Sequence, residues 1–226
     1  MDDRATPQKV LLAWSSGKDS AWALHCLRRE PGVEVAGLLT TLNAAFGRVA
    51  MHAVRREVLE RQMEAAGVPP WLVEIPYPCS NAQYEEAMGG AVRRAREMGI
   101  SAVAFGDLFL RDIRDYRERQ LAGSGVEALF PLWLKDTAAL ARAMLAAGLK
   151  ARVVCVDPKA LDPSFAGREW DEAFLRELPA GADPCGENGE FHTFVYDGPM
   201  FSRPVAVRTG EVVERDGFVF ADLLPG

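Results

Sequence analysis

The segment SSGKDS at residues 15–20 combines small side chains, a lysine and an aspartate in one short stretch. Small Ser and Gly side chains let a phosphate approach the main chain, and Lys18 adds a full positive charge. Asp19 offers a carboxylate to Mg²⁺, and Ser20 is a hydrogen-bond donor or helix N-cap. The segment predicts a phosphate site, with a capped strand-to-helix turn as the alternative. It is not a Walker A sequence, whose two glycines are separated by four residues before Lys-Ser/Thr.

A second polar cluster lies in the segment CGENGEFHT at residues 185–193. On a strand that begins near residue 190, alternation places Glu190 and His192 on the same face, with Glu187 just before them. Such a group can bind a metal, orient a nucleophile or hold a polar substrate. The alternative is an Asn-Gly turn with exposed polar flanks. Cys185 is a weaker nucleophile candidate, because no base lies at motif spacing.

The residues around the 15–20 loop indicate how it is positioned. Residues 10–14 are an apolar run of strand length, and residues 21–29 carry apolar side chains at helical spacing. A strand that turns into a helix directs several backbone N–H groups and the positive end of the helix dipole at one place. We therefore expect an anion-binding loop between this strand and this helix.

A second strand is predicted at residues 33–39, and it continues into residues 40–43 at its C-terminal end. Ligands of open α/β sheets lie at the C-terminal ends of the strands, where this run carries Thr41 and Asn43. Both are candidate nucleoside contacts, and a capped loop is the alternative.

A short apolar run at residues 102–106 predicts a buried parallel strand that ends in Gly106 and Asp107. Gly106 opens space before the carboxylate, so Asp107 is placed to bind Mg²⁺ or a ribose. The densely charged helix that follows is mostly a solvated face. Arg111 and Arg114 are its candidate phosphate contacts, because they lie within two turns of Asp107.

The remaining pattern alternates helices and strands as far as about residue 130. Helices are expected at 47–66 and 81–98, and strands at 71–75 and 150–156. His52, at the start of the first of these helices, is a phosphate contact or a solvated side chain. The tail from residue 190 carries three strand-like runs. This change predicts an ATP-binding α/β domain at 1–130 and a C-terminal substrate-binding region at 131–226.

Composition restricts the class of protein. The chain has 226 residues, of which 49% are hydrophobic and 26% charged, and no apolar run approaches the length needed to span a membrane. Four cysteines form no C-x-x-C pair, which argues against zinc and iron–sulfur sites. The net charge of −6 disfavours non-specific binding of nucleic acid. The N-terminus lacks a signal or transit pattern, so a cytoplasmic location is expected.

The two polar segments together resemble a known family. SSGKDS is similar to the PP-loop of N-type ATP pyrophosphatases, usually written SGGKDS, and CGENGEFHT is similar to the signature of the diphthine–ammonia ligase family within that group. The resemblance covers nearly the whole chain, including AFGDLFLRDIR, ALFPLW and DGPMF. Ser16 departs from the usual glycine. If that position needs a positive φ, Ser16 introduces strain there.

The resemblance implies a HUP-type α/β sandwich with a parallel sheet, followed by a smaller C-terminal α+β region. It implies ATP-dependent amidation, in which a substrate carboxylate attacks the α-phosphate of ATP, pyrophosphate leaves, and ammonia displaces AMP from the acyl-adenylate. ATP, Mg²⁺ and ammonia are the small molecules implied. The implied acceptor is a diphthine-bearing translation elongation factor, or a different carboxylate in a cell that lacks this modification.

The resemblance also implies residue roles. The loop amides with Lys18 would hold the β- and γ-phosphates, and Asp19 and Asp107 would hold Mg²⁺ across them. Glu187, Glu190 and His192 would line the acceptor side, with Glu190 as a hypothetical general base. The implied catalytic residues are Lys18, Asp19, Glu187, Glu190 and His192, and the implied nucleotide-binding residues are Ser15, Ser16, Gly17, Lys18, Asp19, Ser20, Thr41, Gly106, Asp107 and Arg111.

Two other functions remain open. One is a different PP-loop enzyme that acts on another carboxylate or on tRNA, which the acidic charge and the missing C-x-x-C pairs oppose. The other is an adenine-nucleotide sensor that binds ATP without chemistry. A homodimer and a monomer are both compatible with the sequence.

Overall fold

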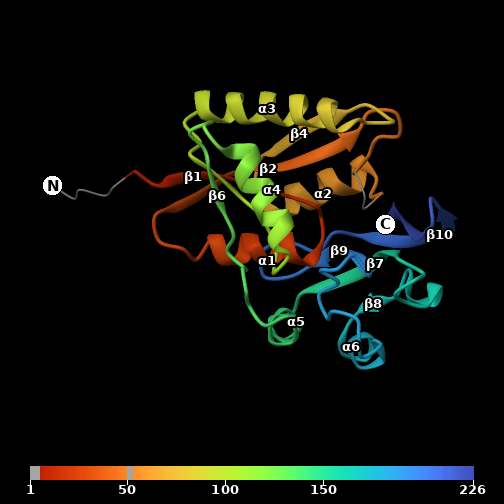
Figure 1. Cartoon of the computed structure of the whole chain (residues 1–226). Helices are drawn as coiled ribbons and strands as arrows, with labels where there is room; N and C mark the ends of the chain where they lie inside the picture. Colours follow the sequence, from red (N-terminus) through yellow and green to blue (C-terminus); the bar gives the residue numbers. More distant parts are fainter. Residues whose placement is uncertain (1–5, 50–52) are drawn as a thin grey trace.

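A computed structural model describes residues 6–49 and 53–226, and it places two β-sheets beside each other with helices around them (Figure 1). The first sheet is formed by the N-terminal part of the chain and the second by the C-terminal part. The elements of the first part are β1 (Gln8–Ala13), α1 (Lys18–Leu27), β2 (Val33–Asn43), β3 (Arg48–Val49), α2 (Arg56–Ala66), β4 (Pro70–Ile75), α3 (Asn81–Glu97), β5 (Ala102–Ala104), α4 (Arg111–Leu121) and β6 (Glu127–Leu129).

The first sheet is parallel except at one corner. Strands β6, β5, β1, β2 and β4 pair in parallel in that order, and the short β3 pairs antiparallel with the end of β2. The chain leaves β1 toward β2 and returns to its other side as β5. The C-terminal end of β1 is therefore the point where the strand order reverses, which is where open α/β sheets bind ligands.

Helices cover both faces of this sheet, as the apolar strands require. Val10 and Leu12 of β1 pack in one buried cluster with α1 and α2, whereas Leu11 packs in a second cluster with α3 and α4. Figure 1 shows α3 above the sheet and α1 below it. The predicted HUP-type α/β sandwich with a smaller C-terminal region is confirmed.

The second sheet is antiparallel. Its order is β10, β11, β7, β8, and β9 pairs with β7. Contacts of β9 with α1 and of β11 with α2 place this sheet against the first part of the chain. Its elements are α5 (Thr137–Ala146), β7 (Lys150–Val156), the 3₁₀ turn η1 (Pro163–Phe165), β8 (Glu169–Trp170), α6 (Glu172–Glu177), β9 (Phe191–Asp197), β10 (Val207–Arg215) and β11 (Phe218–Pro225).

The helix predicted at residues 47–66 is wrong in its first part, because α2 begins only at Arg56. Strand β2 continues to Asn43, and the chain turns at Gly47, whose φ is 58°, to return as β3. His52 lies outside the described residues. The strand predicted at residues 150–156 is present as β7 but belongs to the second sheet. The boundary predicted near residue 130 lies between β6 and α5 and stays a prediction.

Among the helices of residues 6–49 and 53–226, none combines the length and the apolar character that a membrane crossing needs.

Candidate functional site

A cavity of about 530 Å³ opens at the C-terminal ends of β1, β2 and β5. Its wall includes the 15–20 loop, Thr41 of β2, and Gly106 and Asp107 after β5. A second wall is formed by residues of the 183–193 segment, which precedes and enters β9. We call this space the first cavity. Its volume lies within the range of small-molecule sites, so it can hold a nucleotide.

The 15–20 loop leads directly from β1 into α1. Gly17 is the N-cap in an extended conformation, and the Ser20 hydroxyl donates a hydrogen bond to the Gly17 carbonyl oxygen at 2.9 Å. Gly106 allows this turn to approach β5, because a Cβ on Gly106 would stand 3.1 Å from the Asp19 carbonyl carbon and the Ser20 nitrogen. The glycine before Asp107 therefore makes room for the start of α1.

Ser16 occupies a strained backbone position. Its φ of 71° lies in the left-handed region, which costs a side-chain-bearing residue about 1–2 kcal/mol. Its carbonyl oxygen accepts hydrogen bonds from the Val195 N–H at 3.0 Å and the Gln62 amide at 2.9 Å. The fully buried Ser16 hydroxyl has no hydrogen-bond partner among the described residues. Strain at Ser16 was expected only if this position had a positive φ, and the structure shows that it has.

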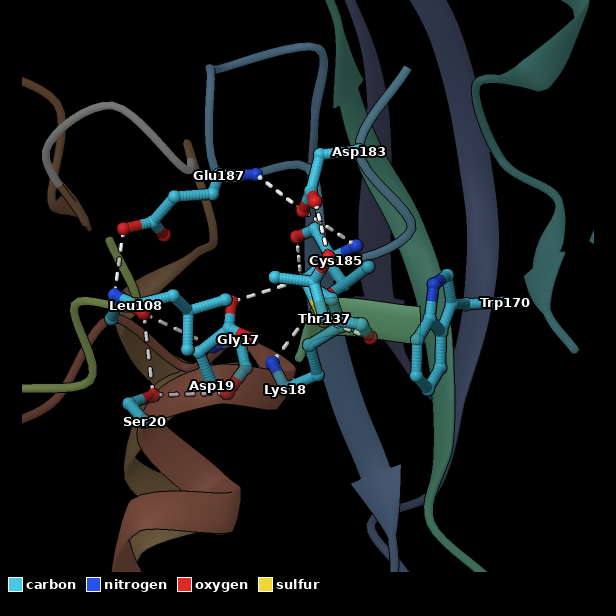
Figure 2. A network of polar contacts seen from close by, with 12 residues as sticks. Gly17, Lys18, Asp19, Ser20, Leu108, Thr137, Trp170, Asp183, Cys185 and Glu187 are labelled. Carbon is cyan, nitrogen blue, oxygen red and sulfur yellow. Dashed lines mark hydrogen bonds and ion pairs between the residues drawn. The ribbon is translucent and has the colours of Figure 1, made fainter. Parts of the chain in front are cut away.

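Lys18 is buried, with 2% of its surface exposed, and it connects the two walls (Figure 2). Its Nζ donates to Asp19 Oδ2 at 2.8 Å and to the Cys185 carbonyl oxygen, and its backbone N–H donates to Thr193 Oγ1 at 3.1 Å. Burial lowers the pKa of Lys18, but the charge and hydrogen bond of Asp19 together with Cys185 and Asp183 outweigh burial and raise this pKa above its ordinary value. Lys18 is therefore a buried cation at the junction of both segments.

Asp19 and Asp107 present carboxylate oxygens to the first cavity. Within residues 6–49 and 53–226, Asp19 Oδ1 and Asp107 Oδ2 are buried without a hydrogen-bond partner. Burial raises the pKa of both groups above the ordinary value, although Lys18 opposes the shift at Asp19 and Arg117 opposes it at Asp107. A cation near these oxygens would relieve the cost of burying them.

No group of three or more His, Cys, Asp and Glu side chains in the described part of the chain is placed to hold a metal ion.

Arg117 of α4 lines the first cavity, whereas the predicted Arg111 is exposed at the start of the helix. The Arg117 guanidinium lies 5.1 Å above the Phe105 ring, and its Nε is 3.8 Å from Asp107 Oδ2. Arg117 is not among the site residues predicted from the sequence. Its helical spacing of four from the half-buried Ile113 and the buried Leu121 is the signal that points it inward.

Glu187 reaches from the 183–193 segment to the loop before α4. Its Oε1 accepts hydrogen bonds from the backbone N–H groups of Leu108 at 2.7 Å and Phe109 at 3.3 Å (Figure 2). Burial raises the pKa of Glu187 to about 7, and the carboxylates of Asp19 and Asp107 add to this shift against the two backbone donors. Glu187 can therefore gain and lose a proton near neutral pH.

Glu190 has a different environment. It is 5% exposed, and its Oε1 accepts from the Asp183 N–H and the Asn188 side-chain amide, both at 2.9 Å. Asp183 in turn accepts from the Cys185 N–H at 2.9 Å and the Thr137 hydroxyl at 2.6 Å. The described lining of the first cavity does not include Glu190. These contacts make Glu190 and Asp183 the internal scaffold of the segment.

His192 lies on β9 and lines the first cavity and a neighbouring second cavity. Burial lowers the pKa of His192 to about 4, and the Lys18 charge adds to the shift. The imidazole is therefore neutral at pH 7. The predicted site residues that line the first cavity are Ser15, Gly17, Lys18, Asp19, Ser20, Thr41, Gly106, Asp107, Glu187 and His192.

Comparison with known proteins matches the chain to two family models. Residues 8–128 match the diphthamide synthase N-terminal domain, and residues 136–220 match the diphthamide synthase C-terminal domain. The chain is 27% identical to a diphthine–ammonia ligase of Danio rerio, over 92% of this chain and 89% of that protein. It is 34% identical to the enzyme of that name from Homo sapiens, over 42% of this chain and 38% of that protein. It is 27% identical to the diphthine–ammonia ligase of Schizosaccharomyces pombe, over 91% of this chain and 37% of that protein.

Proposed function

The chain belongs to the diphthamide synthase family, and from this premise we propose that it is an ATP-dependent ligase that joins ammonia to a substrate carboxylate. A carboxylate oxygen attacks the α-phosphate of ATP and pyrophosphate leaves. The ammonia nitrogen then attacks the acyl carbon of the acyl-adenylate, and AMP leaves as the amide forms. The acceptor to test first is diphthine on the translation elongation factor, since the relatives are named for diphthine.

One observation carries this proposal: the two signature segments line the same cavity. The Lys18 N–H bonds to Thr193, and the Lys18 ammonium bonds to the Cys185 carbonyl oxygen, so the walls are also joined directly. A phosphate-binding loop and a carboxylate-rich acceptor segment that share one space can support a reaction between ATP and an acceptor.

The loop side supplies positive potential for the phosphates. The N-terminus of α1, which carries the positive end of the helix dipole, lies at this space, and Lys18 and Arg117 add two cations at its wall. Such groups stabilise the charge that develops on departing pyrophosphate without reorganising during the reaction. We assign Arg117, rather than Arg111, to this role because Arg117 lines the cavity.

Asp19 and Asp107 fit a magnesium ion. Both line the first cavity, and each has a buried carboxylate oxygen to which no described residue donates. Hard oxygen ligands suit Mg²⁺, which proteins commonly bind through one or two carboxylates together with substrate phosphates. When bound, the ion would neutralise charge on the phosphates.

The acceptor side places two groups at the cavity. Glu187, with a pKa of about 7, is suited to take the proton that nitrogen loses as the amide forms. His192 is neutral at pH 7 and can hydrogen-bond to the acyl group. We place the general base at Glu187, because Glu187 lines the first cavity, whereas Glu190 does not and its Oε1 holds the turn.

The deciding experiment measures AMP and pyrophosphate with purified protein, ATP, Mg²⁺, ammonium and the diphthine-bearing factor, omitting one component at a time. The proposal expects both products only in the complete mixture, with ¹⁵N from labelled ammonium in the factor. Release of ADP and phosphate, or AMP formation at the same rate with and without the acceptor, would contradict the proposal. Nucleotide binding without turnover on any carboxylate would identify a sensor instead.

A further inference from the structure

A second cavity, of about 280 Å³, adjoins the first. It lies between the turn that joins β2 to β3, the loop after β4, and the β10–β11 hairpin. The two cavities share His192 and Val49 in their walls. A group bound in the second cavity therefore lies next to the side of the first cavity where we place the acceptor.

Aromatic rings form much of the wall of the second cavity. Phe46 and Tyr77 stand edge to face on one side with ring centroids 5.0 Å apart, and Phe218 and Phe220 lie 6.4 Å apart on the hairpin. Phe46 is 59% exposed and Tyr77 57% exposed. Large rings at the mouth of a cavity are typical of binding sites, since leaving them in water is unfavourable.

The exposed apolar surface continues past the mouth. Val213 on β10 is 39% exposed and pairs directly with Phe220 across the hairpin, so its side chain lies on the same face of the hairpin as Phe220. A small ligand inside the cavity would not cover this valine. A surface of this extent around an opening fits a protein partner better than a metabolite.

The charges of this region favour a carboxylate. Arg215 is half exposed at the cavity wall, over the Phe220 ring at 4.9 Å, and its Nε is 3.9 Å from the exposed Asp216. By contrast, Arg48 is held by Asp222 at 2.9 Å. Arg215 is thus the cation that can turn toward an incoming carboxylate.

We propose that a protein docks on this surface and inserts its carboxylate-bearing side chain through the second cavity, past His192, into the first. The docking surface consists of Phe46, Tyr77, Val213, Phe218 and Phe220. The inference rests on the proposed function, because it assigns an entry route to the acceptor of that reaction. The acceptor then arrives from the side of the β10–β11 hairpin, while the 15–20 loop holds the phosphates on the other side.

The test uses the diphthine-bearing factor as the probe, prepared from cells that lack the ligase, and measures AMP release against factor concentration. Tyr77→Ala and Phe46→Ala together are expected to raise the KM for the factor about tenfold or more while the Kd for ATP stays unchanged. Both side chains are exposed, so the fold is retained. Met98→Ala is the matched control, since Met98 is 56% exposed at the end of α3, outside both described cavity walls.

Each outcome decides the inference. An unchanged KM in the double variant overturns it while the ligase function stands. Equal kcat/KM for the whole factor and for a short peptide that bears the same side chain also overturns it, because no wider surface is then used. If the wild-type protein forms AMP with a small carboxylate and not with the factor, the inference that a protein docks is overturned, whereas the proposed ligase chemistry still stands. Absence of AMP with every acceptor instead removes the proposed function itself.

Discussion

The two walls of the first cavity are built differently. On the loop side, Asp19 and Asp107 line the cavity, and each keeps one buried carboxylate oxygen that accepts no hydrogen bond from a described residue. On the side of the 183–193 segment, Asp183 Oδ1 and Glu190 Oε1 accept several hydrogen bonds from the turn itself, and the unpartnered Glu190 Oε2 is buried in a residue that does not line the cavity. The loop is thus prepared for charges that a ligand brings, whereas the segment is a stable scaffold that aims Glu187 and His192. Substitutions on the two walls should therefore fail in different ways.

Lys18→Met should have the largest effect, because Lys18 serves both walls. In the proposed reaction, removing its charge weakens stabilisation of the leaving pyrophosphate, and it leaves Asp19 buried without its cation. We expect kcat/KM for ATP to fall by about 10²–10³. Pyrophosphate release measures this, and thermal unfolding shows whether the protein remains folded. Lys159→Met, at an exposed lysine, is the control. Normal pyrophosphate release in Lys18→Met would remove the loop from the mechanism.

Glu187→Gln should reduce turnover on the segment side while leaving ATP binding intact. A general base contributes about 10²–10⁴ to the rate, so we expect kcat to fall by about 10² or more. Because the basic form is required and the pKa is about 7, the wild-type rate should rise as pH increases through 7 at constant free ammonia. The variant should lose this step. A variant that keeps the step would exclude Glu187 as the base, and Glu172→Gln controls for the loss of an exposed carboxylate.

Glu190→Ala should act on stability rather than on chemistry. It leaves the Asp183 N–H and the Asn188 amide without their acceptor in a buried turn, which costs about 1–3 kcal/mol for each unsatisfied group. Denaturant unfolding measures the loss, and Glu190→Gln, which keeps one acceptor oxygen, should lose less. If Glu190→Gln retains full stability but loses turnover as strongly as Glu187→Gln, then Glu190 acts in catalysis and the comparison of the two walls is wrong.

Arg117→Ala should weaken the loop side moderately. The cation is half-buried at the cavity wall and unlike Lys18 does not join the two segments, so we expect about a tenfold increase in KM for ATP. Titration with ATP and initial-rate kinetics check this. Arg111→Ala, on the same helix but exposed, should leave the KM for ATP nearly unchanged. Equal effects of the two substitutions would contradict the assignment of the phosphate contact to Arg117.

Ser16→Gly should have the smallest effect. Glycine adopts a φ of 71° without strain, whereas serine does not. Ser16→Ala also removes the buried hydroxyl but keeps the strain. We therefore expect Ser16→Gly to exceed Ser16→Ala in unfolding free energy by about 1 kcal/mol, measured by chemical denaturation. Equal stabilities would show that the surrounding contacts, not the torsion, dominate at this position.

The sequence predicts the parts of the site that are encoded locally. An apolar strand, a loop of small residues and a helix specify the loop and the position of Lys18, and the same holds for the strand end at Gly106 and Asp107. The inward direction of Arg117 and the scaffold role of Glu190 depend on contacts between distant segments. The helix predicted at 47–66 starts later than expected. The extension of β2 to Asn43 and the turn at Gly47 determine the conformation of the described residues before Arg56, although their apolar spacing is helical.

The hydrogen bonds between the 15–20 loop and strand β9 affect when the site can form during synthesis of the protein. The Gln62 amide donates to the carbonyl oxygens of both Ser16 and Val195. The Lys18 N–H donates to the hydroxyl of Thr193, which lies 175 residues later in the chain. At about 5–20 residues per second, a ribosome needs roughly 9 to 35 s to make that stretch. Throughout this interval the nascent chain has the 15–20 loop but not strand β9, so the first cavity is complete only near the end of translation.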